Sequence, residues 1–261
     1  RTGRARLMGH ARLRNTGKEK EMINEFSRTE LLIGAEAEER LRSASVMVFG
    51  VGGVGSHCIE ALARCGVGKL TLIDNDRVSL TNINRQSIAY HSTVGRYKTE
   101  VMKERIRDIC PDICVDTHET FVLPDNIDAL FGQTGKPDYI IDAIDTVSAK
   151  IALVELAQRE NIPVISSMGT GNKLHPEMFR IADLSETRVC PLCRVMRKEL
   201  KNRGILHLKV LYSEEKPVDT AGRATGEDPG ARRSVPGSIS FVPPAAGLII
   251  AGEVIRALAG I

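Results

Sequence analysis

The sequence predicts an α/β protein with a doubly wound, mostly parallel, Rossmann-like sheet and a C-terminal extension. Two observations carry this prediction. Short apolar runs typical of buried strands alternate with segments in which apolar residues recur at helical spacing. The first of these runs, 45–49, leads into a glycine-rich turn at 50–55 and then a helix. With 261 residues, 42% of them hydrophobic, the chain can bury a sizeable core.

Residues 1–27 differ in composition from the remainder of the chain. They hold seven Lys or Arg and three Glu, a net charge of +4, whereas the whole chain carries a formal net charge of +3. We expect a disordered basic tail there, followed by a single domain at 28–261. Because that domain is close to neutral, the basic balance does not by itself indicate a nucleic-acid binder.

The predicted elements alternate through the first part of the domain. They are a helix at 28–42, a strand at 45–49, helix 56–64, strand 70–73, helix 98–109, strands 114–118 and 139–141, helix 147–160 and a strand from 163. Residues 132–137 superficially resemble a P-loop, but the spacing is short and Pro137 cannot begin the required helix. We interpret that segment as a turn.

The pattern changes beyond residue 166. A strand is predicted at 179–184 and a helix at 192–201, followed by a long loop at 213–237 and a Gly- and Ala-rich helix at 245–258. That last helix is too short to span a bilayer; we expect a dimer contact, with an interfacial membrane contact as the alternative. Six scattered cysteines favour reduced thiols and a cytoplasmic location.

The glycine turn is typical of a nucleotide site, because a helix N-terminus and close backbone approach both favour phosphate. Its candidate residues are Gly50, Gly52, Gly53 and Gly55. Asp74 ends the next strand, where an acid can hold a ribose hydroxyl. A nicotinamide enzyme would need no more than this, and an NAD-dependent oxidoreductase is kept as a distant alternative.

The residues that follow favour a triphosphate. Charged and amide side chains that could neutralise and orient phosphates are Asp76, Asn82, Arg85, Gln86 and Lys98. Asp142 and Asp145 follow a later strand, and carboxylates together with phosphate oxygens suit Mg²⁺. We therefore predict ATP and magnesium as the ligands.

Taken together, these motifs resemble the ThiF-type adenylylating family, which includes ubiquitin-activating enzymes and the activators of ThiS- and MoaD-type sulfur carriers. The resemblance implies that Asp74 holds the ATP ribose and that Asn82, Arg85 and Lys98 bind phosphates. It implies that Asp145 binds magnesium. It further implies a homodimer in which Arg28 reaches into the partner subunit's site, so that the catalytic residues are Arg28, Arg85, Lys98 and Asp145.

Motifs in the second half resemble one subgroup, the tRNA threonylcarbamoyladenosine dehydratases. They are Met168-Gly169-Thr170-Gly171-Asn172-Lys173, Pro191-Leu192-Cys193-Arg194 and the ending from Gly237 to Pro243. The resemblance implies that ATP activates the threonine carboxylate of the modified adenosine beside the anticodon, and that the carbamoyl group then closes a ring with loss of water. A helix with Arg194, Arg197, Lys198 and Lys201, followed by Arg203, would meet RNA phosphates. No DNA partner is expected.

The alternative within the family is activation of the C-terminus of a small sulfur carrier protein. Such activators hold a structural zinc with two Cys-x-x-Cys pairs, whereas this chain has one pair, Cys190 and Cys193, at a place where the subgroup commonly has Asp before Pro-Leu. One pair supplies half of a tetrahedral site, so we expect no zinc. A sulfur carrier or a cysteine-desulfurase-type protein is kept as a candidate accessory partner.

Overall fold

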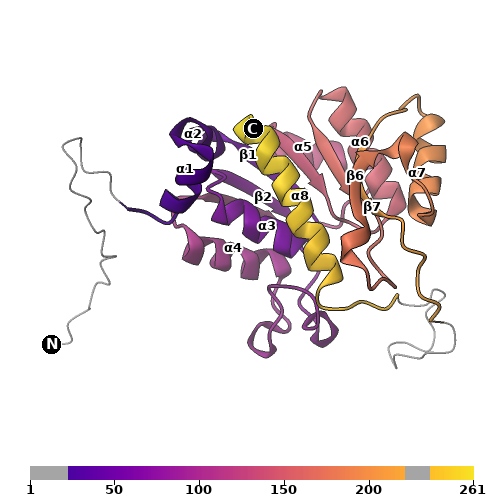
Figure 1. Ribbon diagram of the computed structural model, residues 1–261, viewed down its shortest axis with the longest axis horizontal. Coiled ribbons are helices and arrows are strands. Elements are labelled where there is room, and N and C mark those ends of the chain that lie inside the picture. The colour runs from indigo at the N-terminus through magenta and orange to yellow at the C-terminus, as the bar shows by residue number, and fades with distance from the viewer. Residues whose placement is uncertain (1–22, 221–235) are drawn as a thin grey trace.

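The computed structural model describes residues 23–220 and 236–261 and places one sheet between two layers of helices (Figure 1). The strands are β1 (Ser45–Phe49), β2 (Lys69–Ile73), β3 (Cys114–His118), β4 (Tyr139–Asp142), β5 (Val164–Ser167), β6 (Phe179–Asp183) and β7 (Lys209–Ser213). The helices are α1 (Ser27–Ile33), α2 (Ala35–Ser43), α3 (Gly55–Arg64), α4 (Lys98–Ile109), α5 (Ile127–Thr134), α6 (Val147–Arg159), α7 (Pro191–Lys201) and α8 (Val242–Ala259). Residues 1–22 of the predicted tail over 1–27, and the centre of the predicted loop, 221–235, lie outside the described residues. The prediction of disorder was wrong for the end of that tail, because Phe26 is buried in the core and α1 begins at Ser27.

The sheet order is β3-β2-β1-β4-β5-β7-β6. All neighbouring strands are parallel except β6, which runs antiparallel to β7. The chain builds outward from β1 to β3 on one side and restarts at β4 on the other. Between β1 and β4 lies the point where ligands bind in such sheets, at the carboxyl ends of the strands. The predicted fold class is confirmed.

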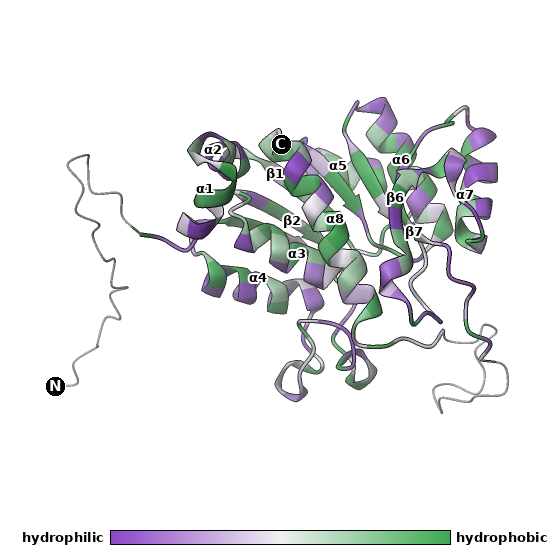
Figure 2. Ribbon diagram, in the orientation of Figure 1, coloured by the Kyte–Doolittle hydropathy of each residue, from purple (hydrophilic) through white to green (hydrophobic). Residues whose placement is uncertain are grey.

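The two faces of β1 belong to different hydrophobic cores. Val46 and Val48 pack with residues of α3, α4 and α8, whereas Met47 and Phe49 pack with residues of α5 and α6. All four side chains are buried, which is typical of a central parallel strand covered on both sides. Figure 2 shows the strands mainly in the hydrophobic colour, with hydrophilic residues along α7.

Three elements differ from the predictions. The helix predicted over 28–42 is two helices, because the chain passes through Gly34 at φ +83°, a conformation that glycine adopts readily. Residues 132–134, predicted as part of a turn, are the last residues of α5, and only Gly135 at φ +76° ends it. Strand β7 was not predicted.

Helix α8 packs along α3 and α2 and is 18 residues long, so the prediction of a helix too short to span a bilayer was wrong. By length and composition α8 could cross a membrane, but Val242, Ala246, Ile250 and Val254 are buried against the rest of the fold. The core helix of a soluble protein passes the same test, so its apolar character has an explanation in packing alone.

Candidate active site

A cleft of about 700 Å³ opens at the carboxyl ends of the central strands. Its walls come from the glycine turn, from residues 73–98, from the loop after β4, from residues 167–171 and from residues 236–243. It gathers most of the predicted site residues, namely Gly50, Gly52, Gly53, Asp74, Asp76, Asn82, Arg85, Gln86, Lys98 and Asp145. Gly55 and Arg28 do not line it.

The glycines of the turn have different physical roles. Gly50 lies at φ +94°, and a Cβ there would lie 2.7 Å from the carbonyl oxygen of Ala143. A Cβ on Gly55 would lie 1.8 Å from the carbonyl oxygen of Gly50, so both positions exclude any side chain. At Gly52 a Cβ would meet only the Nε2 atom of Gln86, at 3.9 Å. The missing side chain at Gly52 therefore leaves room in the cleft itself, where a ligand's phosphates could approach the backbone.

Asp74 connects the end of β2 to this turn. Its Oδ2 atom accepts a hydrogen bond from the backbone N–H of Val51 at 2.6 Å, and its Oδ1 atom accepts one from Asp76 at 2.8 Å. Burial raises the pKa of Asp74 above its usual value, and the nearby Lys98 ammonium and the two N–H donors oppose that rise. The carboxylate thus orders the glycine turn and lies where a ribose could reach it.

Lys98, the first residue of α4, carries the buried cation of the cleft. Its Nζ atom lies 2.7 Å from the Oδ2 atom of Asp76, and its side chain is 6% exposed while that of Asp76 is 58% exposed. A buried ammonium needs a partner, and here the partner reaches in from the solvent side. Asp76, predicted as a ligand-binding residue, therefore lies in the structure as the counter-ion of Lys98.

Three predicted residues lie on the segment around the short helix η1 (Leu80–Asn82). The Oδ1 atom of Asn82 accepts a hydrogen bond from the Ser79 N–H at 3.1 Å and so caps η1. The Nη1 atom of Arg85 donates to the Thr81 carbonyl at 2.9 Å. Gln86 is buried, and its Oε1 atom has no partner among the described residues. An unpaired buried acceptor costs about 1–3 kcal/mol, so this amide beside the cleft indicates a place for a ligand donor or a water molecule.

The predicted pairing of Asp142 with Asp145 at a magnesium ion was wrong for Asp142. This carboxylate is fully buried, and its Oδ2 atom lies 3.0 Å from the Nζ atom of Lys150, which is also fully buried. Lys150 also donates to the Ser167 carbonyl at 2.8 Å. Sequence reasoning missed Lys150, although a lone charge inside the apolar run 149–154 is a signal of a buried partner.

The Asp142–Lys150 pair supports the loop that carries Asp145. The Oδ1 atom of Asp142 accepts a hydrogen bond from the Ile144 N–H at 3.3 Å. Asp145 itself is exposed in the cleft wall, where Thr146 contacts it at 3.4 Å. Within residues 23–220 and 236–261 no group of three His, Cys, Asp or Glu could hold a metal ion. A cation at Asp145 would need most of its ligands from phosphate oxygens and water, as Mg²⁺ commonly does.

Arg28 is exposed near the start of α1 and does not line the cleft of its own chain. The two apolar residues that follow on this helix, Leu31 and Leu32, are 77% and 86% exposed. Among the described residues, α1 therefore presents two exposed leucines and an exposed arginine.

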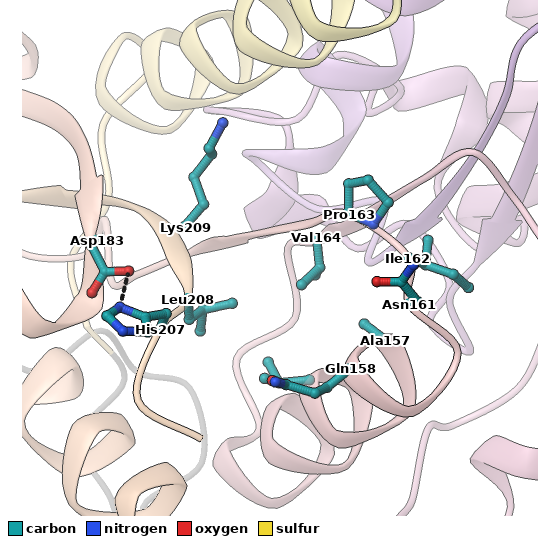
Figure 3. A pocket seen from close by; sticks show the side chains of 11 residues that line it. Ala157, Gln158, Asn161, Ile162, Pro163, Val164, Asp183, His207, Leu208 and Lys209 are labelled. Carbon is teal, nitrogen blue, oxygen red and sulfur yellow. Dashed lines mark hydrogen bonds and ion pairs between the residues drawn. The ribbon is translucent and has the colours of Figure 1, made fainter. Parts of the chain in front are cut away.

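A second cleft, of about 450 Å³, lies at the opposite end of the strands, where β5 and β7 begin (Figure 3). His207 and Asp183 face each other there, with Nδ1 and Oδ2 3.3 Å apart, and the His207 side chain is 81% exposed. None of the predicted site residues lines it. Because ligands of open α/β sheets bind at the carboxyl ends of the strands, the first cleft is the candidate active site.

Comparison with known proteins agrees with this fold. A family model described as the ThiF family matches residues 26–261. The chain is 43% identical to the tRNA threonylcarbamoyladenosine dehydratase of Bacillus subtilis over 91% of this chain and 95% of that protein. It is 40% identical to the Escherichia coli protein of the same name over 73% of each.

Solved structures of two other proteins resemble this chain in fold. The E. coli tRNA N6-threonylcarbamoyladenosine dehydratase in complex with ATP is 35% identical, matches 90% of this chain and 94% of that chain, and has a TM-score of 0.79. E. coli MccB with ATP is 19% identical, over 94% of this chain and 65% of that chain, and its TM-score of 0.64 shows a similar fold alone.

The buried ion pair predicts a specific pattern of stability. Lys150→Met should lower the free energy of unfolding by about 3–5 kcal/mol, because it leaves the Asp142 carboxylate buried without its cation. The pair of changes Asp142→Leu and Lys150→Met should cost less than the single change, since no charge remains. Urea unfolding measures both, with Lys201→Met on the exposed face of α7 as the matched control. A single variant as stable as that control would show that the pair does not hold the loop.

Proposed function

Because this chain belongs to the ThiF family, we propose that its cleft binds ATP and that the protein catalyses the ATP-dependent dehydration of threonylcarbamoyladenosine in tRNA. The observation that carries the proposal is the meeting of Asp74, Arg85, Lys98 and Asp145, from four separate segments, at one edge of the sheet. The close relatives that carry this activity in their names span nearly the whole chain. The oxidoreductase alternative gains no support from them.

Different groups of the cleft suit different parts of ATP. The backbone at Gly52 and the N-terminus of α3 suit phosphates, and Asp74 suits the ribose hydroxyls. Lys98 and Arg85 neutralise charge on the departing pyrophosphate. Magnesium fits the Asp145 carboxylate together with phosphate oxygens and would add positive charge beside the leaving group.

The reaction needs no nucleophile from the protein. The threonine carboxylate of the substrate attacks the α-phosphate and is activated as an acyl-adenylate. The carbamoyl group of the same substrate then attacks the acyl carbon and displaces AMP. The attacking group is already tethered, and effective molarities of well-oriented intramolecular reactions reach about 10⁵ M or more. The protein therefore contributes positions and charges.

Mass spectrometry of digested tRNA tests the reaction. With ATP, Mg²⁺ and tRNA that carries linear threonylcarbamoyladenosine, we expect a nucleoside lighter by one water and the release of AMP and pyrophosphate. Asp145→Asn should abolish both products, while Asp219→Asn, outside the cleft lining, serves as the matched control. An unchanged nucleoside together with adenylylation of a small carrier protein would overturn the proposal in favour of the alternative within the family.

We propose that the active form is a homodimer in which each cleft receives Arg28 from the partner subunit. Three facts support this: Arg28 is exposed, it is not part of its own chain's cleft, and Leu31 and Leu32 beside it are exposed. Exposed leucines at this density are typical of a surface that another chain covers. An arginine from the partner subunit would place a further positive charge beside the triphosphate, at the mouth of the cleft.

Mixed dimers test the role of Arg28. Arg28→Ala and Lys98→Ala should each be inactive alone, because each removes a cation from every site. Mixing the two variants should restore about a quarter of the wild-type rate, since half of the dimers are hybrids and each hybrid has one intact site. Wild-type chains mixed with the double variant are the control for subunit exchange. Hybrids that form and stay inactive would place Arg28 outside the partner's site.

The exposed face of α7 is the surface that we propose meets tRNA. Arg194, Lys198 and Lys201 recur at helical spacing on one face, and none has an ion-pair partner in the part of the chain that the structure describes. The face begins beside the cleft, because Leu192 lines it. Arg197, expected on this surface, instead donates to the carbonyls of Leu184 and Thr187.

Charge reversal tests this surface. Lys198→Glu with Lys201→Glu should raise the KM for tRNA about tenfold or more and make the dependence on salt less steep, because phosphate contacts are lost. The affinity for ATP, measured by calorimetry, should not change. Lys103→Glu with Arg107→Glu on α4 introduces the same charge elsewhere and should leave the KM for tRNA near the wild-type value. Equal effects from both pairs would assign the result to net charge alone.

A further inference from the structure

The dithiol of Cys190 and Cys193 is a chemically distinct feature that the proposed reaction does not use. Cys190 is the N-cap of α7 and Cys193 lies one turn later, so the two side chains share one side of the helix start. Both are free thiols and are buried, at 6% and 1% exposure, in the same hydrophobic cluster. No third metal-binding side chain joins them among the described residues.

The backbone before Cys190 is strained. Val189 has φ +61°, and the Cys190 N–H donates to the Arg188 carbonyl at 2.6 Å across this tight turn. A β-branched residue in the left-handed region costs about 1–3 kcal/mol, and such strain persists where the surrounding structure imposes it. Here it turns the chain into the start of α7, where Cys190 is the N-cap residue and makes no side-chain cap hydrogen bond.

Four donors or cations act on the Cys190 sulfur. The backbone N–H groups of Leu192 and Cys193, the thiol of Cys193 and the ammonium of Lys173 lie near it and favour its anionic form. Lys173 is itself buried, held by a 2.9 Å hydrogen bond from Nζ to the Glu215 carbonyl. These groups lower the pKa of Cys190 to about 6, whereas the donated hydrogen bond and burial raise that of Cys193.

Three other cysteines behave in the opposite way. Loss of water raises the pKa of Cys58, Cys65 and Cys110, and at Cys110 the backbone N–H of Asp112 opposes this rise only in part. The environment of Cys190 is therefore built around the anionic form of its sulfur. An ordinary packed cysteine would not need it.

We propose that Cys190 and Cys193 form a redox-active dithiol that closes to a disulfide with a hydroperoxide as the oxidant and is reopened by two equivalents of a small-molecule thiol, which leave as their own disulfide. The Cys190 thiolate attacks one peroxide oxygen of hydrogen peroxide, which gives a sulfenic acid and hydroxide. The Cys193 sulfur then attacks the Cys190 sulfur, and the sulfenic oxygen leaves as water once it and the hydroxide have taken up the two protons. In sum, two thiols and one peroxide give one disulfide and two waters, with two electrons passing from sulfur to oxygen.

The burial of Cys190 limits the size of the oxidant that can reach its sulfur. At 6% exposure Cys190 admits a molecule of the size of peroxide, whereas the disulfide of another protein could not reach it. Leu192 lies between the two cysteines in sequence and lines the candidate active site, so the bond would form next to a residue of that cleft. The proposal does not rest on the tRNA reaction, because neither ATP nor tRNA takes part in it.

The test is peptide mapping after peroxide treatment of the reduced protein. Trypsin cuts after Arg188 and Arg194, so the peptide Val189–Arg194 contains both cysteines. We expect this peptide to lose two hydrogens before Cys114, the exposed cysteine, is modified, and to regain them with dithiothreitol. Cys193→Ser should stop at a sulfenic acid that dimedone traps at Cys190, and Cys114→Ser should behave as the wild type.

Thiolate absorbance gives an independent measurement. The wild type should show a thiolate that titrates with a midpoint at about pH 6, and Cys190→Ser and Cys190→Ala should both lose it while Cys193→Ala keeps a thiolate. If Cys114 is oxidised first while Val189–Arg194 stays reduced, or if Cys190 passes to sulfinic acid without forming the disulfide, the proposal is overturned. These readouts report on the thiols alone, so they stand or fall independently of the dehydratase activity.

Discussion

The absence of side chains at Gly50 and Gly55 is the constraint on which the active site depends. These two positions let β1, the start of α3 and the loop after β4 meet within a distance that no Cβ could enter. The Asp74 carboxylate holds the same turn from β2 through the Val51 N–H. The cleft residues that follow different strands are therefore fixed to one another before a ligand arrives, which reduces the ordering that binding requires.

Two buried lysines lie at this end of the strands, and they differ in how exposed their carboxylate partners are. The partner of Lys98 is Asp76, whose side chain is mostly exposed and so is free to turn toward water. The partner of Lys150 is Asp142, which is as buried as the lysine and is also held by Ser166 and Ile144. The carboxylate partner of Lys98 can therefore be exchanged for another anion, whereas the partner of Lys150 cannot. In each pair the exposure of the carboxylate sets this difference.

Much of the fold and site could be predicted because the signals are local. The glycine turn, Asp74 and Lys98 stand next to the ends of elements with clear periodicity, and β1 and α4 have the predicted bounds. The predictions that failed concern residues whose partners are distant in sequence, or elements whose local sequence pattern is weak. β7 is a short apolar run that gains its place by pairing with β5 and β6, and α5 is short and contains Gly132. The role of Asp142 depends on Lys150 in the next helix, which no spacing rule reveals.

Helix α8 has a consequence for how the protein is made. It packs on α3, where Gly247 lies so close to the Val54 carbonyl that a Cβ there would be 2.3 Å from it, and its first residues line the cleft through Pro243. The glycine turn that lines the cleft is near residue 50, whereas the helix that packs against α3 ends at 259. During translation the glycine turn leaves the ribosome long before this cover is available. The nascent chain therefore exposes the apolar side of α3 until synthesis of α8 is complete, and in that interval this surface is open to aggregation with other chains.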